Sequence, residues 1–206
     1  MKPLITTLLA LCLLALTTAP TLAQRTDWSH FGETPTVGHK QTLHLDSRTV
    51  RLIDRMVRAK ADSLKSIADA KVSTLRDANG LLAIKITLSG SGMPAEPNVT
   101  GYNSASQSAM QTLAHHLTDA WAAADIFVDG HTDNVGPYDE NMTVSFRRAL
   151  AISNLLVRTG VDSARVEPRG FAYDYPIADN HLIEGREANR RVEVTLCVGQ
   201  AMLDRL

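Results

Sequence analysis

The sequence predicts an α/β (α+β) sandwich, in which helices pack on a mixed β-sheet and a helical segment precedes that sheet. Short strand-like stretches alternate with longer stretches of helical period, which gives the order β-α-β-α-β-(α)-β. The length of 206 residues and the hydrophobic content of 44% suffice for one ordinary globular domain with additional segments. The formal net charge of -1 provides no strong field, so we expect no nucleic-acid partner.

Residues 1–23 have the layout of a cleavable secretory signal peptide. Lys2 precedes the apolar run Leu4–Leu16, and small residues follow it up to Ala23. A membrane-spanning helix needs about 20 predominantly apolar residues, whereas this run is shorter and is flanked and interrupted by threonines. We therefore predict cleavage after Ala23 and a location in the periplasm or at the cell outer membrane. The polar residues 24–45 predict a linker or an ordered arm.

Residues 46–78 predict a helical segment. Asp46 is a suitable N-cap, and we expect the helix to end near Leu75. Apolar residues recur at steps of three and four along one stripe: Val50, Ile53, Val57, Ala61, Leu64 and Ile67. The other face is basic, and it could attract anionic envelope polymers or be an ordinary solvated surface. We favour the solvated surface, because so small a charge excess is screened within about 8 Å at physiological salt.

Residues 79–200 predict the globular domain, which begins at the turn signal Asn79-Gly80. The region from 90 to 103 is rich in glycine and proline and predicts a loop. The expected elements are a strand at Leu81–Leu88, a helix from Ser104, a strand at Ile126–Val128, a helix at Met142–Thr159, a strand at Arg165–Phe171, a short helix or loop at Asn180–Asn189 and a strand at Val192–Val198.

Arg148 is the anomalous residue of the second long helix. It lies on one stripe with Val144, Ile152 and Leu156, because these positions are four residues apart. An unpaired charge on the buried face of a helix is very costly. Arg148 therefore requires a carboxylate, either from the protein or from a ligand.

Asp133 is the candidate carboxylate within the protein. It follows the carboxyl end of the Ile126 strand, and open α/β sheets tend to bind ligands outside that end of their strands. Asp133 and Arg148 could pair with each other and close the loop. Alternatively, each could bind one end of a zwitterionic ligand. The residues alone leave these two interpretations about even.

Three blocks of residues resemble the signature of the OmpA-like peptidoglycan-binding domain family, which includes the peptidoglycan-associated lipoprotein and the periplasmic domain of the flagellar stator protein MotB. The blocks are Gly130-His131-Thr132-Asp133, Asn141-x-x-Val144-Ser145-x-x-Arg148-Ala149 and Gly185-Arg186-x-x-Asn189-Arg190-Arg191-Val192-Glu193. The resemblance is close over residues 126–198 and looser over 81–121. After the first strand, residues 88–102 depart from the pattern of many family members.

The resemblance implies non-covalent binding of peptidoglycan through the diaminopimelate of its stem peptide, which would anchor the protein or the outer membrane to the cell wall. By motif position, Asp133 would bind the ammonium group and Arg148 the carboxylate, to which a guanidinium fork is well matched. Backbone N–H groups near Thr132 could also hold the carboxylate. Asn141 would cap its helix or touch the ligand, and we favour capping. Of Arg190 and Arg191, one would brace the fold and one would line the site.

Enzymatic activity is the first rival function, and we expect none. His131 with Asp133, or His181 with its acidic neighbours, has no third metal ligand at a familiar spacing, so we expect no metal and no cofactor. Ser145 lacks a nucleophile elbow, and Cys197 has no nearby basic helper.

A structural role is the second rival, in which the N-terminal run is kept as an inner-membrane anchor of a stator or scaffold that docks to peptidoglycan. A homodimer through the 46–78 helix, or through an interchain bond at Cys197, also stays open, as does association with the outer membrane. For Cys197, which would be the only cysteine of the mature chain, we favour the role of a small apolar residue in the last strand.

Overall fold

The computed structural model describes residues 43–67, 70–90 and 104–205. The predicted signal peptide, most of the predicted linker and most of the predicted 90–103 loop lie outside the described residues. The described elements are α1 (Ser47–Leu64), β1 (Ala70–Arg76), β2 (Leu82–Ser89), α2 (Ser104–Thr118), β3 (Asp125–Gly130), α3 (Tyr138–Arg158), the 3-10 turn η2 (Ser163–Arg165), β4 (Val166–Gly170), α4 (Ile183–Asn189), β5 (Arg191–Cys197) and α5 (Gln200–Leu203).

The strands form one five-stranded sheet in the order β1-β2-β5-β3-β4. β3 and β4 are parallel and are joined through α3, while the other neighbouring strands are antiparallel. β5 lies at the centre, because Leu196 pairs with Ile84 of β2 on one side and with Ile126 of β3 on the other. The mixed sheet and the predicted order β-α-β-α-β-(α)-β from β2 to β5 are confirmed.

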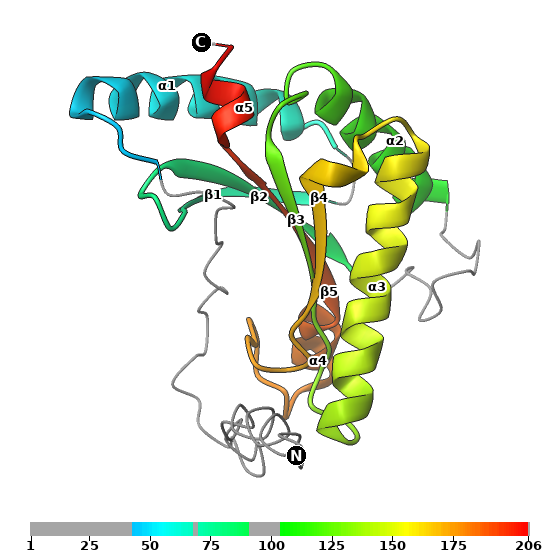
Figure 1. Cartoon of the computed structure of the whole chain (residues 1–206). Coiled ribbons are helices and arrows are strands. Elements are labelled where there is room, and N and C mark those ends of the chain that lie inside the picture. Colours follow the sequence, from blue (N-terminus) through cyan, green and yellow to red (C-terminus); the bar gives the residue numbers. More distant parts are fainter. Residues whose placement is uncertain (1–42, 68–69, 91–103, 206) are drawn as a thin grey trace, which may run out of the picture.

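The main hydrophobic core lies between one face of this sheet and the helices α1, α2 and α3 (Figure 1). The alternation of β5 supplies Val192, Val194 and Leu196 to this face, together with Val198 just after the strand. The helical stripes supply residues such as Ile53 from α1 and the matching apolar positions of α2 and α3: Met110, Leu113, Leu117, Ile152 and Leu156. Burial of these stripes is the main stabilising contribution to all three helices.

The predicted helix at 46–78 is too long. Asp46 caps it as expected, accepting hydrogen bonds from the N–H groups of Arg48 and Thr49, but α1 ends at Leu64. Residues Ala70–Arg76 instead form β1, an edge strand that pairs with β2 through the hairpin turn at Asn79-Gly80. Gly80 has φ +72, a conformation that glycine adopts without steric cost.

The other face of the sheet carries charged side chains that are buried in pairs. Glu193 binds both Arg191, at 2.7 Å, and Lys85, at 3.2 Å, and Arg169 binds Asp129 at 2.7 Å. Cys197 lies on this same face with a fully buried thiol, whose pKa burial raises. An interchain disulfide through Cys197 would therefore require this buried thiol to become exposed. Among the helices of the described ranges, none combines the length and apolar character required to traverse a membrane.

Candidate functional site

Three segments that are distant in sequence meet at one end of the sheet. The loop after β3 carries His131, Thr132 and Asp133, α3 carries Arg148, and Arg190 directly precedes β5. They converge because Gly130, the last residue of β3, pairs with Val192 near the start of β5. Figure 1 shows this end, with α4 and the start of α3, at the bottom of the molecule.

Asp133 pairs with Arg190 and not with Arg148. Its Oδ2 accepts a hydrogen bond from Arg190 Nη1 at 2.6 Å, and its Oδ1 accepts one from the Val135 N–H at 3.0 Å. Arg190 is thus the member of the arginine pair that lies in the candidate site. Arg191 is 1% exposed and braces the fold, since it binds Glu193 and the carbonyl oxygen of Tyr175.

Arg148 meets no carboxylate within the described part of the chain. Its Nη1 donates a long hydrogen bond of 3.4 Å to the backbone oxygen of His131, while its buried Nε has no hydrogen-bond partner. Burial lowers the pKa of Arg148 and the positive charge of Arg190 lowers it further, although Asp133 acts in the opposite direction. Among the described residues, Arg148 therefore has no ion pair that would offset its charge on this face of the helix.

Thr132 and His131 also place unpartnered polar atoms beside Asp133. The Oγ1 of Thr132 is buried and has no hydrogen-bond partner among the described residues, although the Thr132 N–H donates to the Ala172 carbonyl at 2.8 Å. The His131 ring stacks on Phe171 with centroids 5.7 Å apart, and neither ring nitrogen has a partner in this part of the chain. Burial holds the pKa of His131 well below its ordinary value, so the ring is neutral in the folded protein.

Ser145 and Ala172 fix this loop region against α3, a role that was not predicted from the sequence for either residue. Ser145 Oγ donates to the Met142 carbonyl and accepts a hydrogen bond from the Ala172 N–H at 3.0 Å. Ala172 has φ +42, which is uncommon for a residue with a side chain and is tolerated here because its N–H and C=O are both bonded. The available signal was Ser145 itself, a polar residue three positions before Arg148 on the inner side of the helix.

Asn141 does not cap α3, so the favoured sequence interpretation was wrong. The helix begins at Tyr138, with Pro137 in the N-cap position and no side-chain cap. Asn141 lies one turn further in, and its Nδ2 donates to the carbonyl oxygens of Val135, at 2.9 Å, and Pro137, at 3.1 Å. It therefore holds in place the loop whose Val135 N–H donates to Asp133.

α3 lies very close to the ends of the parallel strands because both strands end in glycine. Gly130 and Gly170 are paired across β3 and β4, beneath Ser145 and Phe146. A Cβ atom on Gly130 would overlap the Ser145 backbone oxygen, and one on Gly170 would lie 2.8 Å from the Phe146 nitrogen. This close approach sets the position of Arg148 relative to the loop after β3.

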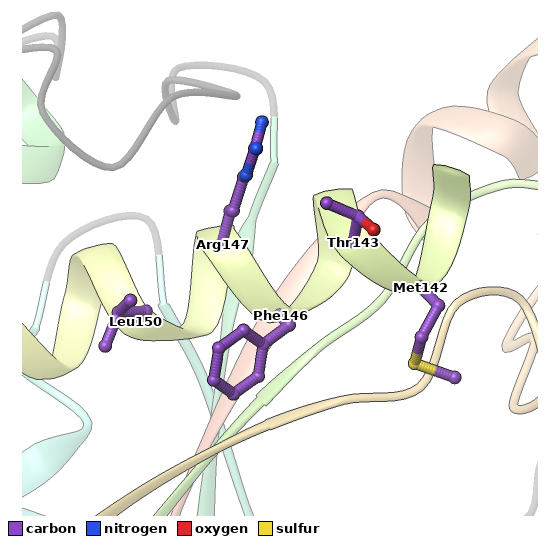
Figure 2. A pocket seen from close by; sticks show the side chains of 5 residues that line it. All are labelled: Met142, Thr143, Phe146, Arg147 and Leu150. Carbon is purple, nitrogen blue, oxygen red and sulfur yellow. The ribbon is translucent and has the colours of Figure 1, made fainter. Parts of the chain in front are cut away.

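A separate hollow of about 470 Å³ lies on another face of α3 (Figure 2). It is lined by Met142, Thr143, Phe146, Arg147 and Leu150. Phe146 is 200° around the helix from Arg148 by the rotation of about 100° per residue, so the hollow is distinct from the candidate site. Among the described residues, no group of three or more His, Cys, Asp or Glu side chains is placed to hold a metal ion.

Comparison with known proteins supports the family suggested by the sequence blocks. Residues 96–190 match the OmpA family. The chain is 33% identical over 135 residues to the probable lipoprotein YiaD of Escherichia coli, an alignment that covers 62% of each chain. It is 34% identical over 87 residues to the peptidoglycan-associated lipoprotein of Pseudomonas aeruginosa, covering 42% of this chain and 52% of that protein.

A solved structure described as the cell wall anchor of the T6SS from Pseudomonas aeruginosa has a similar fold. The match has a TM-score of 0.53 and 26% identity, and it covers 70% of this chain and 98% of that one. The first two blocks that carry the resemblance lie within residues 96–190, and the third, 185–193, begins within this range. The similarity to the OmpA family therefore covers the part of the chain that carries the candidate site.

Proposed function

We propose that this chain binds peptidoglycan non-covalently through the diaminopimelate of its stem peptide, and so anchors itself or the outer membrane to the cell wall. The observation that carries the proposal is the state of Arg148. A partly buried arginine whose Nε is buried and has no partner among the described residues, and which adjoins an ion-paired carboxylate, suits a ligand that brings its own carboxylate.

In this proposal, each of the two charges binds one end of a zwitterion. The ligand carboxylate would accept hydrogen bonds from Arg148, and the Thr132 hydroxyl could provide another donor. The ligand ammonium would bind Asp133, which keeps free lone pairs because a carboxylate offers about four acceptor sites and two are used here. Asn141 and Arg190 would act by holding the loop and Asp133 in place.

The names of the relatives support the same class of function. One is called a peptidoglycan-associated lipoprotein, and one similar structure is called a cell wall anchor. These names describe anchoring and not catalysis, so we infer that this chain is likewise a binding protein without enzymatic activity. Export fits this proposal, and an N-terminus at Gln24 in the purified protein would establish it. An intact Met1 in the inner-membrane fraction would instead favour the anchored stator or scaffold.

The test is sedimentation of the full-length protein with sacculi that contain diaminopimelate. We expect Asp133→Asn and Arg148→Gln each to weaken binding by about 10-fold or more, because each removes a charge-assisted hydrogen bond. Asp139→Asn and Arg158→Gln, at exposed positions of the same helix, are the matched controls and should bind normally.

Circular dichroism would reveal a variant that fails to fold. Competition with free ligand tests the same site in the wild-type protein and does not depend on the folding of any variant. Free diaminopimelate should displace the wild-type protein from sacculi. Cadaverine keeps the two ammonium groups of diaminopimelate but lacks both carboxylates, so it should not displace the protein. Binding that survives both substitutions, or that cadaverine displaces equally well, would show that the site lies elsewhere.

A further inference from the structure

α1 presents a row of arginines that the proposed function does not use. We name Arg48, Arg51, Arg55 and Arg58 the arginine stripe. Steps of three and four residues place them on one side of the helix, and all of them are exposed. Leu52 lies beside the arginine stripe with 52% of its surface exposed.

Neighbouring carboxylates offset only part of the charge of the arginine stripe, since Asp46 attracts Arg51 and Asp54 attracts Arg58. Asp54 binds Arg76 at 2.6 Å and accepts from the Leu82 N–H, and Asp62 pairs with Lys65 at 2.7 Å. Within the described ranges, no arginine of the stripe forms an ion pair with a carboxylate. The whole chain has a net charge of -1, and salt screens exposed charges within about 8 Å, so the stripe can attract an anionic partner only in direct contact.

The arginine stripe and the candidate wall-binding site lie at opposite ends of the sheet. Asp54 of α1 contacts the first residue of β2, Leu82, and Ile84 pairs with Leu196 near the end of β5. The candidate site adjoins the start of β5, where Ser89 of β2 pairs with Arg191. Figure 1 shows α1 across the top of the molecule and α4 near the bottom.

A second copy of the chain is a poor occupant of this surface. A symmetric dimer through the arginine stripe would bring the same arginines of the two chains together, and like charges placed opposite each other are unfavourable. A flat surface of phosphate groups is the better match. Guanidinium groups bind phosphate strongly, and a row of them along a straight helix can meet a plane at several points.

We propose that the arginine stripe docks the protein onto the anionic phosphate headgroups of a phospholipid bilayer. The apolar stripe of α1 is buried in the core, so the helix would lie on the headgroups through its charges, with Leu52 as the apolar contact. The orientation of this surface, away from the wall, rests on the proposed function. The lipid binding itself does not depend on it.

The test is flotation of the full-length protein with vesicles of phosphatidylglycerol and phosphatidylethanolamine, compared with vesicles of phosphatidylcholine alone. We expect binding to the anionic vesicles only, and release at high salt. Each basic residue near an anionic surface contributes about fivefold in affinity, so Arg51→Gln, Arg55→Gln and Arg58→Gln together should weaken binding on the order of 100-fold. Arg48 is kept so that the first turn of α1, beside the N-cap Asp46, is unchanged.

The matched control combines Lys71→Gln, Arg158→Gln and Arg205→Gln, which remove the same charge at exposed positions outside the stripe. It should bind like the wild type. Equal loss in the control, equal binding to phosphatidylcholine, or unchanged binding of the stripe variant would overturn the proposal. The stripe variant should still sediment with sacculi, so failure of lipid binding and failure of wall binding can be told apart.

Discussion

The candidate site contains one carboxylate, Asp133, and two guanidinium groups, Arg148 and Arg190. The carboxylate pairs with only one of them. Asp133 lies 2.6 Å from Arg190, while Arg148 reaches only the His131 backbone oxygen. Arg148 and Asp133 were identifiable from sequence, because one interrupts an apolar stripe and the other follows a buried strand. Arg190 could not be identified as the partner of Asp133 from sequence, because Arg190 and Arg191 are adjacent and chemically identical. Only the fold determines which of the two side chains reaches Asp133.

The buried ring of His131 should make the stability of the protein depend on pH. The ring is neutral when folded because burial holds its pKa well below the unfolded value of about 6.5. Below that value the unfolded chain binds the extra proton, so stability falls as the pH falls. When the pH is lowered from about 7.5 to about 5.5, protonation of His131 in the unfolded chain should reduce the free energy of unfolding by about 1 kcal/mol. Urea denaturation at both pH values measures this loss.

The variant His131→Phe is the comparison, because it keeps an aromatic ring against Phe171 and removes the titrating group. Its stability should change less than that of the wild type over the same pH interval. An identical pH dependence in the variant would mean that other groups account for the acid sensitivity. The comparison uses the difference between two pH values, so any packing cost of phenylalanine cancels.

At the scale of elements, the period of the apolar residues predicted most strands and helices correctly. The prediction was wrong at β1, which was expected to be part of the first helix. Ile67 continues the helical step of α1, which led the predicted helix past Leu64. β1 is an edge strand of mostly half-exposed residues, so its own sequence has no strong apolar alternation. The overlooked signal was Asn79-Gly80, since such a turn implies a strand on each side.

The packing of α3 on the strand ends leads to a prediction for Gly130. Gly130→Ala would force its Cβ into the Ser145 backbone, so α3 must shift and the loop with Asp133 must move with it. We expect a loss of about 2 kcal/mol or more in unfolding free energy, together with weaker binding to sacculi. Denaturant unfolding and sedimentation measure the two effects.

Gly80→Ala is the matched control. Gly80 has a positive φ but no atom within 4 Å of the added Cβ, so only backbone strain of about 1 kcal/mol is expected. Its binding to sacculi should be unchanged, because the turn is at the other end of β2. A larger cost at Gly80 than at Gly130 would contradict the close packing of α3.

At the scale of the whole molecule, one core joins α1 to the remainder of the fold. Lys60 reaches across to the Ala120 backbone oxygen at 2.6 Å, with its amine 5.8 Å from the Trp121 ring centroid. The sequence could not place α1 on the sheet, because this contact joins residues that are 60 positions apart. The arrangement leaves the arginine stripe and the candidate wall-binding site at opposite ends.

Both proposals together predict that the protein brings vesicles and sacculi together. Sacculi incubated with the wild-type protein should carry fluorescent anionic vesicles into the pellet. The variant of the arginine stripe should not carry vesicles into the pellet because it does not bind them, and Arg148→Gln should not because it does not bind sacculi. A mixture of the two variants should not restore the transfer of vesicles to the pellet. Restoration by the mixture would imply that two copies share the task instead of one molecule spanning it.

The central position of β5 determines how such a molecule would respond to mechanical load. A force applied between the arginine stripe and the candidate site would act along the strands. It would be transmitted from β3 to β2 through β5, which pairs with both. The backbone hydrogen bonds of β5 with both neighbours would then be loaded in shear and would have to break together. This geometry resists force far better than peeling a hairpin one bond at a time, as suits a link between two layers that move against each other.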